Sequence, residues 1–254
     1  MKRIWFIRHG ESESNAGLPS KDPGSPPLTQ RGRGQAEYVA KYINEKPDLI
    51  ITSSYIRTQE TAAPTLKKFS DVPTDIWPVE EFTYLSSLLF ANTTVSQRRR
   101  SGMRFWKKRD PAYHDGPGAE SFNDLFARAE KTFELIRKSD AKSLLIFSHG
   151  WFIRAILHRL YFQPDENNLY RKADVKTLRE RKYISAMATA YFNLRKVPND
   201  KQKMLHYLAF SSTFQIPNTA ILKFSLGEEK KFEFLEKYTK HIPPELKGNF
   251  LVDR

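Results

Sequence analysis

The sequence predicts a three-layer α/β/α fold, with a mainly parallel central sheet between helices and helical insertions over the carboxyl-end rim. Two observations predict it: short apolar runs of β type recur along the chain, and stretches of helical spacing alternate with them. The length of 254 residues is enough to bury a substantial core, and would also allow two domains. We interpret residues 1–254 as one domain with insertions at about 82–119 and 161–216.

The predicted elements follow each other in a strand–helix order. Residues 3–7 form an apolar strand, and Leu28-Thr29 opens a helix with Thr29 as N-cap and Pro47 as its end. The later elements are a buried strand over 48–52, a helix from about 57 to 69, a short strand near 74–79, a buried strand over 143–148, an apolar helix through Leu160, a final strand over 220–224 and a polar tail of about twenty residues.

Polar residues follow several of these strands directly. Arg8 and His9 end the first strand, Ser53-Ser54 follows the second, and His149 follows the strand over 143–148. In a sheet of this kind, ligands bind beyond the carboxyl ends of the strands. We therefore expect these residues to share one rim, although they lie far apart in the sequence.

The tripeptide Arg8-His9-Gly10 is the central chemical signal. The planar guanidinium of an arginine can bind two phosphoryl oxygens, and a neutral imidazole is a competent nucleophile toward phosphorus. Gly10 lets the chain turn sharply, since it has no Cβ. The pattern is typical of phosphoryl transfer to His9.

Five sequence blocks, in order, resemble those of the histidine phosphatase superfamily, also called the phosphoglycerate mutase-like family. The first is Arg8-His9-Gly10-Glu11-Ser12 with Asn15 after it, and the second is Pro27-Leu28-Thr29 with Gly32 and Gln35-Ala36. The others are Ser53 to Ala62, which contains Arg57, then Gly118-Ala119-Glu120-Ser121, and then Ser148-His149-Gly150.

The resemblance implies that His9 is the nucleophile and that Arg8, Arg57 and His149 bind the phosphoryl oxygens. It also implies that Asn15 and Ser12 lie near the pocket. Two arginines and a protonated histidine then supply the positive charge that phosphoryl transfer needs, so we expect neither a metal ion nor another cofactor.

The family's proton donor is an acidic residue after the short strand, which here indicates Glu81, with Glu80 as the rival. A carboxyl group near a phosphate dianion has its pKa raised by the like charge, so it can donate a proton near neutral pH. The sequence after the acid, Phe82-Thr83-Tyr84-Leu85, replaces the Gly-containing loop of the mutases. We therefore predict a phosphomonoester hydrolase, with mutase-type phosphotransfer as the alternative.

The composition limits the partners. A net charge of +13 and a pI of about 9.7 attract anions. The absence of cysteine excludes disulfides and thiolate chemistry, and no apolar run approaches the roughly 20 residues of a membrane helix. Residues 1–8 lack a signal-peptide core, so we expect a cytoplasmic protein without a membrane partner.

Two other functional classes have weaker support. Phe105 and Trp106 among the arginines of 98–109 would suit a nucleic-acid-binding module, but no recognised binding motif accompanies them. A metallohydrolase using His9 and His149 would need further ligands at metal spacing. We expect instead that the basic segments 98–109 and 171–182 select a phosphorylated, polyanionic small molecule. The sequence indicates neither the substrate itself nor the oligomeric state.

Overall fold

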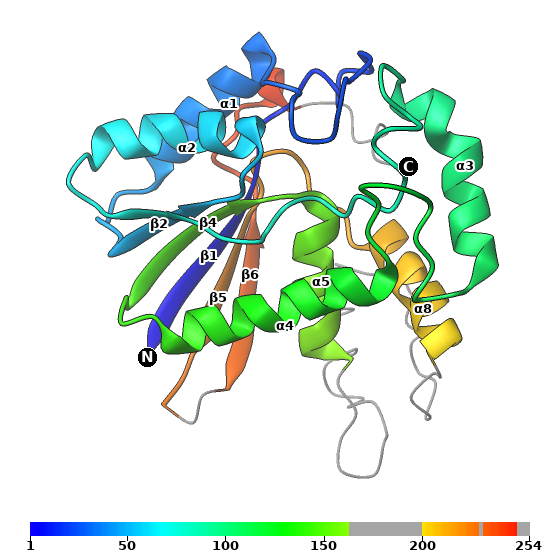
Figure 1. Cartoon of the computed structure of the whole chain (residues 1–254). Coiled ribbons are helices and arrows are strands. Elements are labelled where there is room, and N and C mark those ends of the chain that lie inside the picture. Colours follow the sequence, from blue (N-terminus) through cyan, green and yellow to red (C-terminus); the bar gives the residue numbers. More distant parts are fainter. Residues whose placement is uncertain (163–199, 229–230, 248–254) are drawn as a thin grey trace.

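The computed structural model describes residues 1–162, 200–228 and 231–247 (Figure 1). Its centre is a six-stranded sheet in the order β3-β2-β4-β1-β5-β6. The strands are β1 (Lys2–Arg8), β2 (Leu49–Thr52), β3 (Thr74–Ile76), β4 (Ser143–Ser148), β5 (Ile221–Leu226) and β6 (Phe232–Tyr238). The helices are α1 (Gln30–Tyr42), α2 (Ile56–Lys68), α3 (Val95–Lys108), α4 (Phe122–Lys138), α5 (Gly150–Tyr161) and α8 (Asp200–Thr213), followed by a 3₁₀ turn at Pro244–Leu246.

The strand directions agree with the predicted α/β class, and the structure contains one strand, β6, that the sequence did not predict. Strands β3, β2, β4 and β1 are parallel, whereas β5 runs antiparallel to β1 and β6 antiparallel to β5. The strand near residue 220 is therefore not the last, and the expected polar tail begins with β6. Only Phe232 and Phe234 of β6 are buried, and Glu233 and Leu235, which alternate with them, are exposed. Such a half-buried edge strand has little apolar signal of its own.

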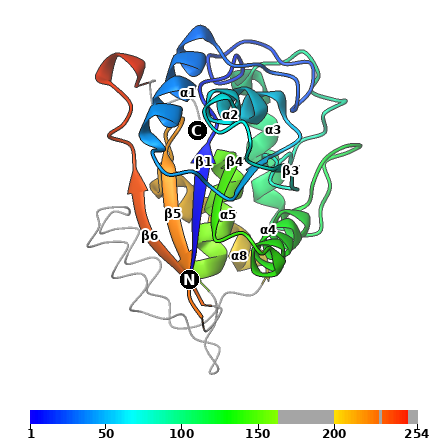
Figure 2. The same ribbon diagram turned by 90° about the vertical axis from the view of Figure 1, so that its left-hand side faces the viewer.

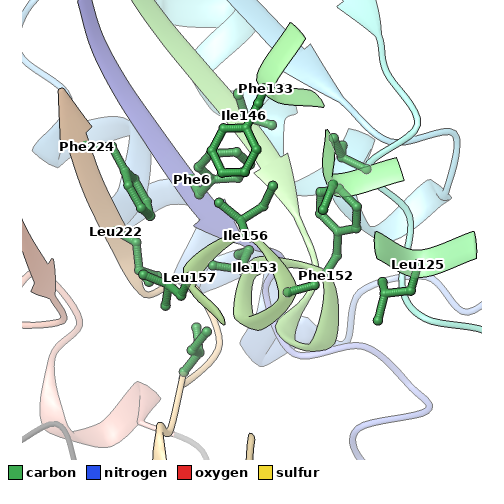
Figure 3. Close-up of a cluster of buried hydrophobic side chains, with 14 of the residues drawn as sticks. Phe6, Leu125, Phe133, Ile146, Phe152, Ile153, Ile156, Leu157, Leu222 and Phe224 are labelled. Carbon is green, nitrogen blue, oxygen red and sulfur yellow. The ribbon is translucent and has the colours of Figure 1, made fainter. Parts of the chain in front are cut away.

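The sheet has a hydrophobic cluster on each face. In β1, Ile4 and Phe6 contribute to the cluster of α4, α5 and α8, whereas Trp5 and Ile7 contribute to the cluster of α1 and α2. Neighbouring residues divide in this way because successive side chains of a strand point to opposite faces. Figure 3 shows the first cluster, in which Ile153, Ile156 and Leu157 of α5 lie against the sheet.

Side chains cap the N-termini of α1, α3 and α4. Thr29 Oγ1 accepts a hydrogen bond from the Gly32 N–H at 3.0 Å, which confirms the predicted N-cap of α1. Ser121 caps α4 in a reciprocal arrangement with Asp124. Figure 2 shows α1 and α2 together on one side of the sheet, with α4, α5 and α8 on the other.

The predicted insertion at 82–119 contains α3, which stands at the end of the molecule opposite the N-terminus (Figure 1). Its Phe105 and Trp106 are buried in the aromatic core and do not form an exposed stacking surface. In the insertion predicted at 161–216, the basic cluster 171–182 lies outside the described residues, and α8 is the described helix. None of the helices within the described ranges is long and apolar enough to cross a bilayer.

Candidate active site

The carboxyl ends of three neighbouring strands converge at one point. Arg8 pairs with Ser148 in the parallel β1–β4 register, and the His9 N–H donates to the Ser148 carbonyl at 2.9 Å. His9 and His149, each the first residue beyond its strand, thereby come together, with ring centroids 5.0 Å apart. The rim predicted from the sequence is present in the structure.

The hydrogen bonds of His9 determine its tautomer. Its Nδ1 lies 2.6 Å from the Gly10 carbonyl oxygen, and a carbonyl can only accept, so Nδ1 carries the proton. Its Nε2 accepts from the Arg57 Nε–H at 3.2 Å, so this nitrogen holds the lone pair. Burial and the charges of Arg57 and Arg8 lower the pKa of His9 well below its usual range. The imidazole is therefore neutral at pH 7.

Arg57 enters the site from the first turn of α2. Its side chain is fixed by donation from Nη1 to the Pro23 carbonyl at 2.6 Å and by the ring of Tyr55, 4.8 Å from the guanidinium carbon. Burial lowers the pKa of Arg57 to about 10, which leaves it charged at neutral pH. The guanidinium is thus a fixed positive charge beside the His9 lone pair.

The guanidinium of Arg8 lies at the N-terminus of α5. Its Nη1 donates to the Ile216 carbonyl at 2.6 Å, and Arg154 Nε donates to the Phe214 carbonyl at 2.9 Å. A Cβ on Gly150 would lie 3.2 Å from Arg154 Nη1 and 3.4 Å from Arg8 Nε. Gly150 therefore leaves room for two buried guanidinium groups beside a helix N-terminus, an arrangement that favours an anion.

The surroundings of His149 oppose the protonated form that we expect during phosphoryl transfer. Burial and the charge of Arg57 lower the pKa of His149 well below its usual range. Its Nε2 is hydrogen-bonded to Ser53 Oγ at 2.8 Å. Its Nδ1 is buried and has no hydrogen-bond partner among the described residues.

The two acidic candidates lie in different environments. Glu81 lines the same cavity as His9, and its Oε1 accepts from the Trp151 N–H at the N-terminus of α5 at 2.9 Å. Glu80 points elsewhere: its Oε1 accepts from the N–H and hydroxyl of Ser54, and its Oε2 lies 3.7 Å from Arg128. The geometry therefore favours Glu81 as the acid that faces the site.

A cavity of about 930 Å³ opens from His9 toward α3 and α8. Besides His9, its polar lining includes Arg57, Glu81 and Asn15. Of the basic residues of α3, those that line it are Arg98, Arg99 and Lys107. Among the described residues, no group of three or more His, Cys, Asp or Glu side chains is placed to hold a metal ion.

Residues 4–180 match the sequence profile of the histidine phosphatase superfamily (branch 1). The chain belongs to this superfamily. It is 29% identical, over 64% of its length and 81% of the relative's, to an adenosylcobalamin/alpha-ribazole phosphatase of Salmonella typhimurium. It is 24% identical, over 62% and 77% of the two lengths, to a putative phosphoserine phosphatase 2 of Hydrogenobacter thermophilus.

The fold of the superfamily is also found in solved structures. The alpha-ribazole phosphatase of Shigella flexneri aligns with a TM-score of 0.61 over 92% of this chain and 94% of that one, at 20% identity. A phosphoserine phosphatase from Entamoeba histolytica aligns with a TM-score of 0.60 over 96% and 100%, at 19% identity. The predicted fold class is thereby confirmed.

Within this superfamily member, Asn218 is a site residue that the sequence did not reveal. Its Nδ2 donates to the His9 carbonyl and to Asn15 Oδ1, both at 3.1 Å. Ser12 lies beside this network, since Ser12 Oγ accepts from the Asn15 N–H at 3.3 Å. Thr219, at a left-handed φ of 58°, donates its N–H to the carbonyls of Arg8 and His9. The turn before β5 thus fixes the backbone of the nucleophile candidate.

Gly10 is required for a reason different from the predicted turn. The φ angle of Gly10 is not positive, but a Cβ at this position would lie 2.6 Å from the Gly32 carbonyl oxygen. A Cβ on Gly32 would in turn overlap the carbonyl of Glu11. The two glycines therefore allow the first turn of α1 to pack directly against the loop that follows His9.

Proposed function

We propose that this chain is a metal-independent phosphomonoester hydrolase that acts through a phosphohistidine on His9. The observation that carries the proposal is the Nε2 lone pair of a neutral imidazole held among Arg8, Arg57 and His149. A nucleophile toward phosphorus needs such a lone pair, and the phosphoryl oxygens need fixed positive charge around them.

In the first step, His9 Nε2 attacks phosphorus and the ester P–O bond breaks. The leaving oxygen takes a proton from Glu81, so that a neutral alcohol departs. In the second step, Glu81 accepts a proton from water, the water oxygen attacks phosphorus and the P–N bond breaks. Inorganic phosphate leaves, and His9 regains its lone pair.

The three other basic residues supply binding and charge. The guanidinium groups of Arg8 and Arg57 are both buried and their charges both act on His9, so they can bind separate phosphoryl oxygens. His149 Nδ1 is a buried polar atom of the kind that a ligand satisfies. A phosphate dianion would also favour the protonated form of His149, so its charge would arrive with the substrate. Asn15 and Ser12 hold the loop beside the pocket.

Hydrolysis is favoured over mutase-type transfer by the residues after the acid. Phe82, Thr83, Tyr84 and Leu85 all line the cavity next to Glu81, where they take the place of a Gly-containing loop. The likeness to proteins named as alpha-ribazole and phosphoserine phosphatases supports the same choice.

We further propose that the substrate is a phosphorylated small molecule with several negative charges. Arg99 and Lys107 of α3 are exposed and line the cavity. A cavity lined by one sign of charge raises the local concentration of a counter-ion, an effect that salt screens.

The test is the release of phosphate from phenyl phosphate. We expect turnover by the wild-type protein, unchanged in a chelator, and its loss in His9→Ala. His114→Ala is the matched control, because His114 is exposed and pairs with Asp124 away from the cavity. Full activity of His9→Ala would disprove the proposal, and a rate that falls with chelator would disprove metal independence.

A further inference from the structure

Three aromatic rings that contact one another stand beside Glu81. Trp106 and Trp151 are stacked, with centroids 5.6 Å apart and planes at 19°, and Tyr84 lies 5.8 Å from Trp106 and 6.1 Å from Trp151. All three line the cavity that contains His9. Trp151 also donates its backbone N–H to the Glu81 carboxylate. Burial and the charge of Glu81 raise the pKa of Tyr84, so the Tyr84 side chain also lies near the carboxylate.

The position of Glu81 shows which part of a substrate would meet this aromatic wall. A proton donor has to reach the oxygen that leaves with the alcohol, within hydrogen-bond distance. The phosphoryl group would be held by His9 and the arginines, and the leaving oxygen would turn toward Glu81. Residues beside Glu81 would therefore lie near the alcohol that carries this oxygen.

Apolar side chains continue the wall away from His9. Met103 of α3, one turn before Lys107, lines the cavity and is 51% exposed. Leu205 and Leu208 of α8 line it as well and are half-buried. Apolar side chains that stay accessible inside a concave site are surface that a ligand would cover.

The size of the cavity agrees with a large occupant. Its volume of about 930 Å³ lies near the upper end of typical small-molecule sites, which span roughly 300–1,000 Å³. A phosphoryl group with a two- or three-carbon polar alcohol would leave most of this space, and most of the apolar wall, uncovered.

We infer that the phosphomonoester taken by this site carries an extended apolar alcohol, which lies against Tyr84, Trp106, Trp151 and Met103. This inference rests on the proposed function and names the substrate class of the same site. The charged groups of such a substrate would face Arg99 and Lys107 of α3, which are exposed and line the cavity.

The first test is a series of n-alkyl phosphates from ethyl to octyl. Their leaving groups are nearly equal in basicity, so a change in kcat/KM along the series measures burial of the chain. We expect kcat/KM to rise about twofold to fourfold per methylene, close to the value of a buried CH₂. A flat or falling series, with ethyl phosphate still hydrolysed, would overturn the inference and leave the proposed function intact. Failure to hydrolyse any member or phenyl phosphate would instead contradict the proposed function.

The second test places a polar group on the wall. Met103→Gln should lower kcat/KM for octyl phosphate about tenfold, as expected for loss of a buried apolar contact, with little change for ethyl phosphate. Leu88→Gln is the matched control, because Leu88 is 72% exposed and lies outside the cavity. Equal effects of Met103→Gln on the two substrates, or equal effects of the two variants on octyl phosphate, would contradict the inference.

Discussion

The Nε of Arg57 lies 3.2 Å from the Nε2 of His9 and donates its proton to the lone pair that would attack phosphorus. In the unliganded site this hydrogen bond holds the imidazole in one tautomer. A bound phosphoryl group would come between the two side chains and take over the guanidinium's donors. Arg57 would therefore exchange a bond to the nucleophile for bonds to the phosphoryl oxygens.

Arg57→Lys tests this exchange, because lysine keeps the charge and loses the planar fork of donors. We expect kcat/KM for phenyl phosphate to fall about 10²-fold to 10³-fold, the usual loss when a transition-state donor is removed. Arg33→Lys is the control: Arg33 is exposed on α1 and bonds the Leu28 carbonyl. Similar rates for Arg57→Lys and wild type would assign Arg57 a structural role only.

Glu81→Gln should separate substrates by their leaving groups. Alkyl phosphates need a proton on the departing oxygen and should slow about 10²-fold or more, the usual contribution of a general acid. Nitrophenyl phosphate, whose leaving group needs no proton, should lose far less in the first step. Steady-state kcat/KM with both substrates gives the comparison.

The control for this prediction is the neighbouring acid. Glu80→Gln keeps an acceptor for Ser54 and removes a charge near Arg128, outside the cavity. It should leave both substrates near wild-type rates. A selective loss on alkyl phosphates in Glu80→Gln, and not in Glu81→Gln, would reverse the assignment.

Two glycines of α1 should respond in opposite ways to the same substitution. Gly32→Ala forces a Cβ into the Glu11 carbonyl and should lower the free energy of unfolding by about 1–3 kcal/mol or more. In Gly34→Ala the Cβ meets only the Leu246 side chain, at 3.4 Å, so better helix propensity should stabilise by up to about 1 kcal/mol. Urea unfolding measures both values. An unchanged Gly32→Ala would show that this contact relaxes easily.

The stability should also fall in acid because of buried histidines. Burial lowers the pKa of His9, His149 and His158 well below their usual range, and that of His206 to about 4. Their unfolded forms take up protons near pH 6.5 while the folded forms do not, so the unfolded state binds more protons as the pH falls. For each such histidine, the free energy of unfolding should fall by about 1.4 kcal/mol per pH unit as the pH is lowered from about 6 to about 4.

Unfolding free energies at pH 7, 6 and 5 measure this slope. His206→Phe should reduce this slope by the contribution of about one proton, about 1.4 kcal/mol per pH unit. The substitution removes one titrating group from the buried His158–His206 pair. An equal slope in wild type and His206→Phe would show that other groups dominate the acid response.

The strand ends were predictable from the sequence because their signals are local. A buried run followed by Arg8-His9 or by His149 fixes both the strand and the residue beyond it, and parallel strands end at one rim. Neighbouring residues of an extended chain point to opposite sides, so Glu80 and Glu81 could be distinguished only by packing. In the structure, α5 offers its N-terminus to Glu81.

Asn218 could not be predicted for a different reason. Its contact with His9 depends on β5 running antiparallel beside β1, which brings the preceding turn to the end of β1. No pattern within residues 214–220 indicates that direction. The lowered pKa of His149 could not be predicted either, because it results from burial, which the sequence does not report.

The central claim, covalent transfer to His9, is tested most directly by trapping the intermediate. Glu81→Gln mixed with nitrophenyl phosphate should form the phosphoenzyme faster than it is hydrolysed, since the proposed mechanism also makes Glu81 the base toward water. After a denaturing quench, we expect one acid-labile, base-stable phosphate, which mass spectrometry should map to His9. It should be absent from the double variant that carries both Glu81→Gln and His9→Ala. Turnover without a trapped phosphate, or a phosphate on any other residue, would contradict the account.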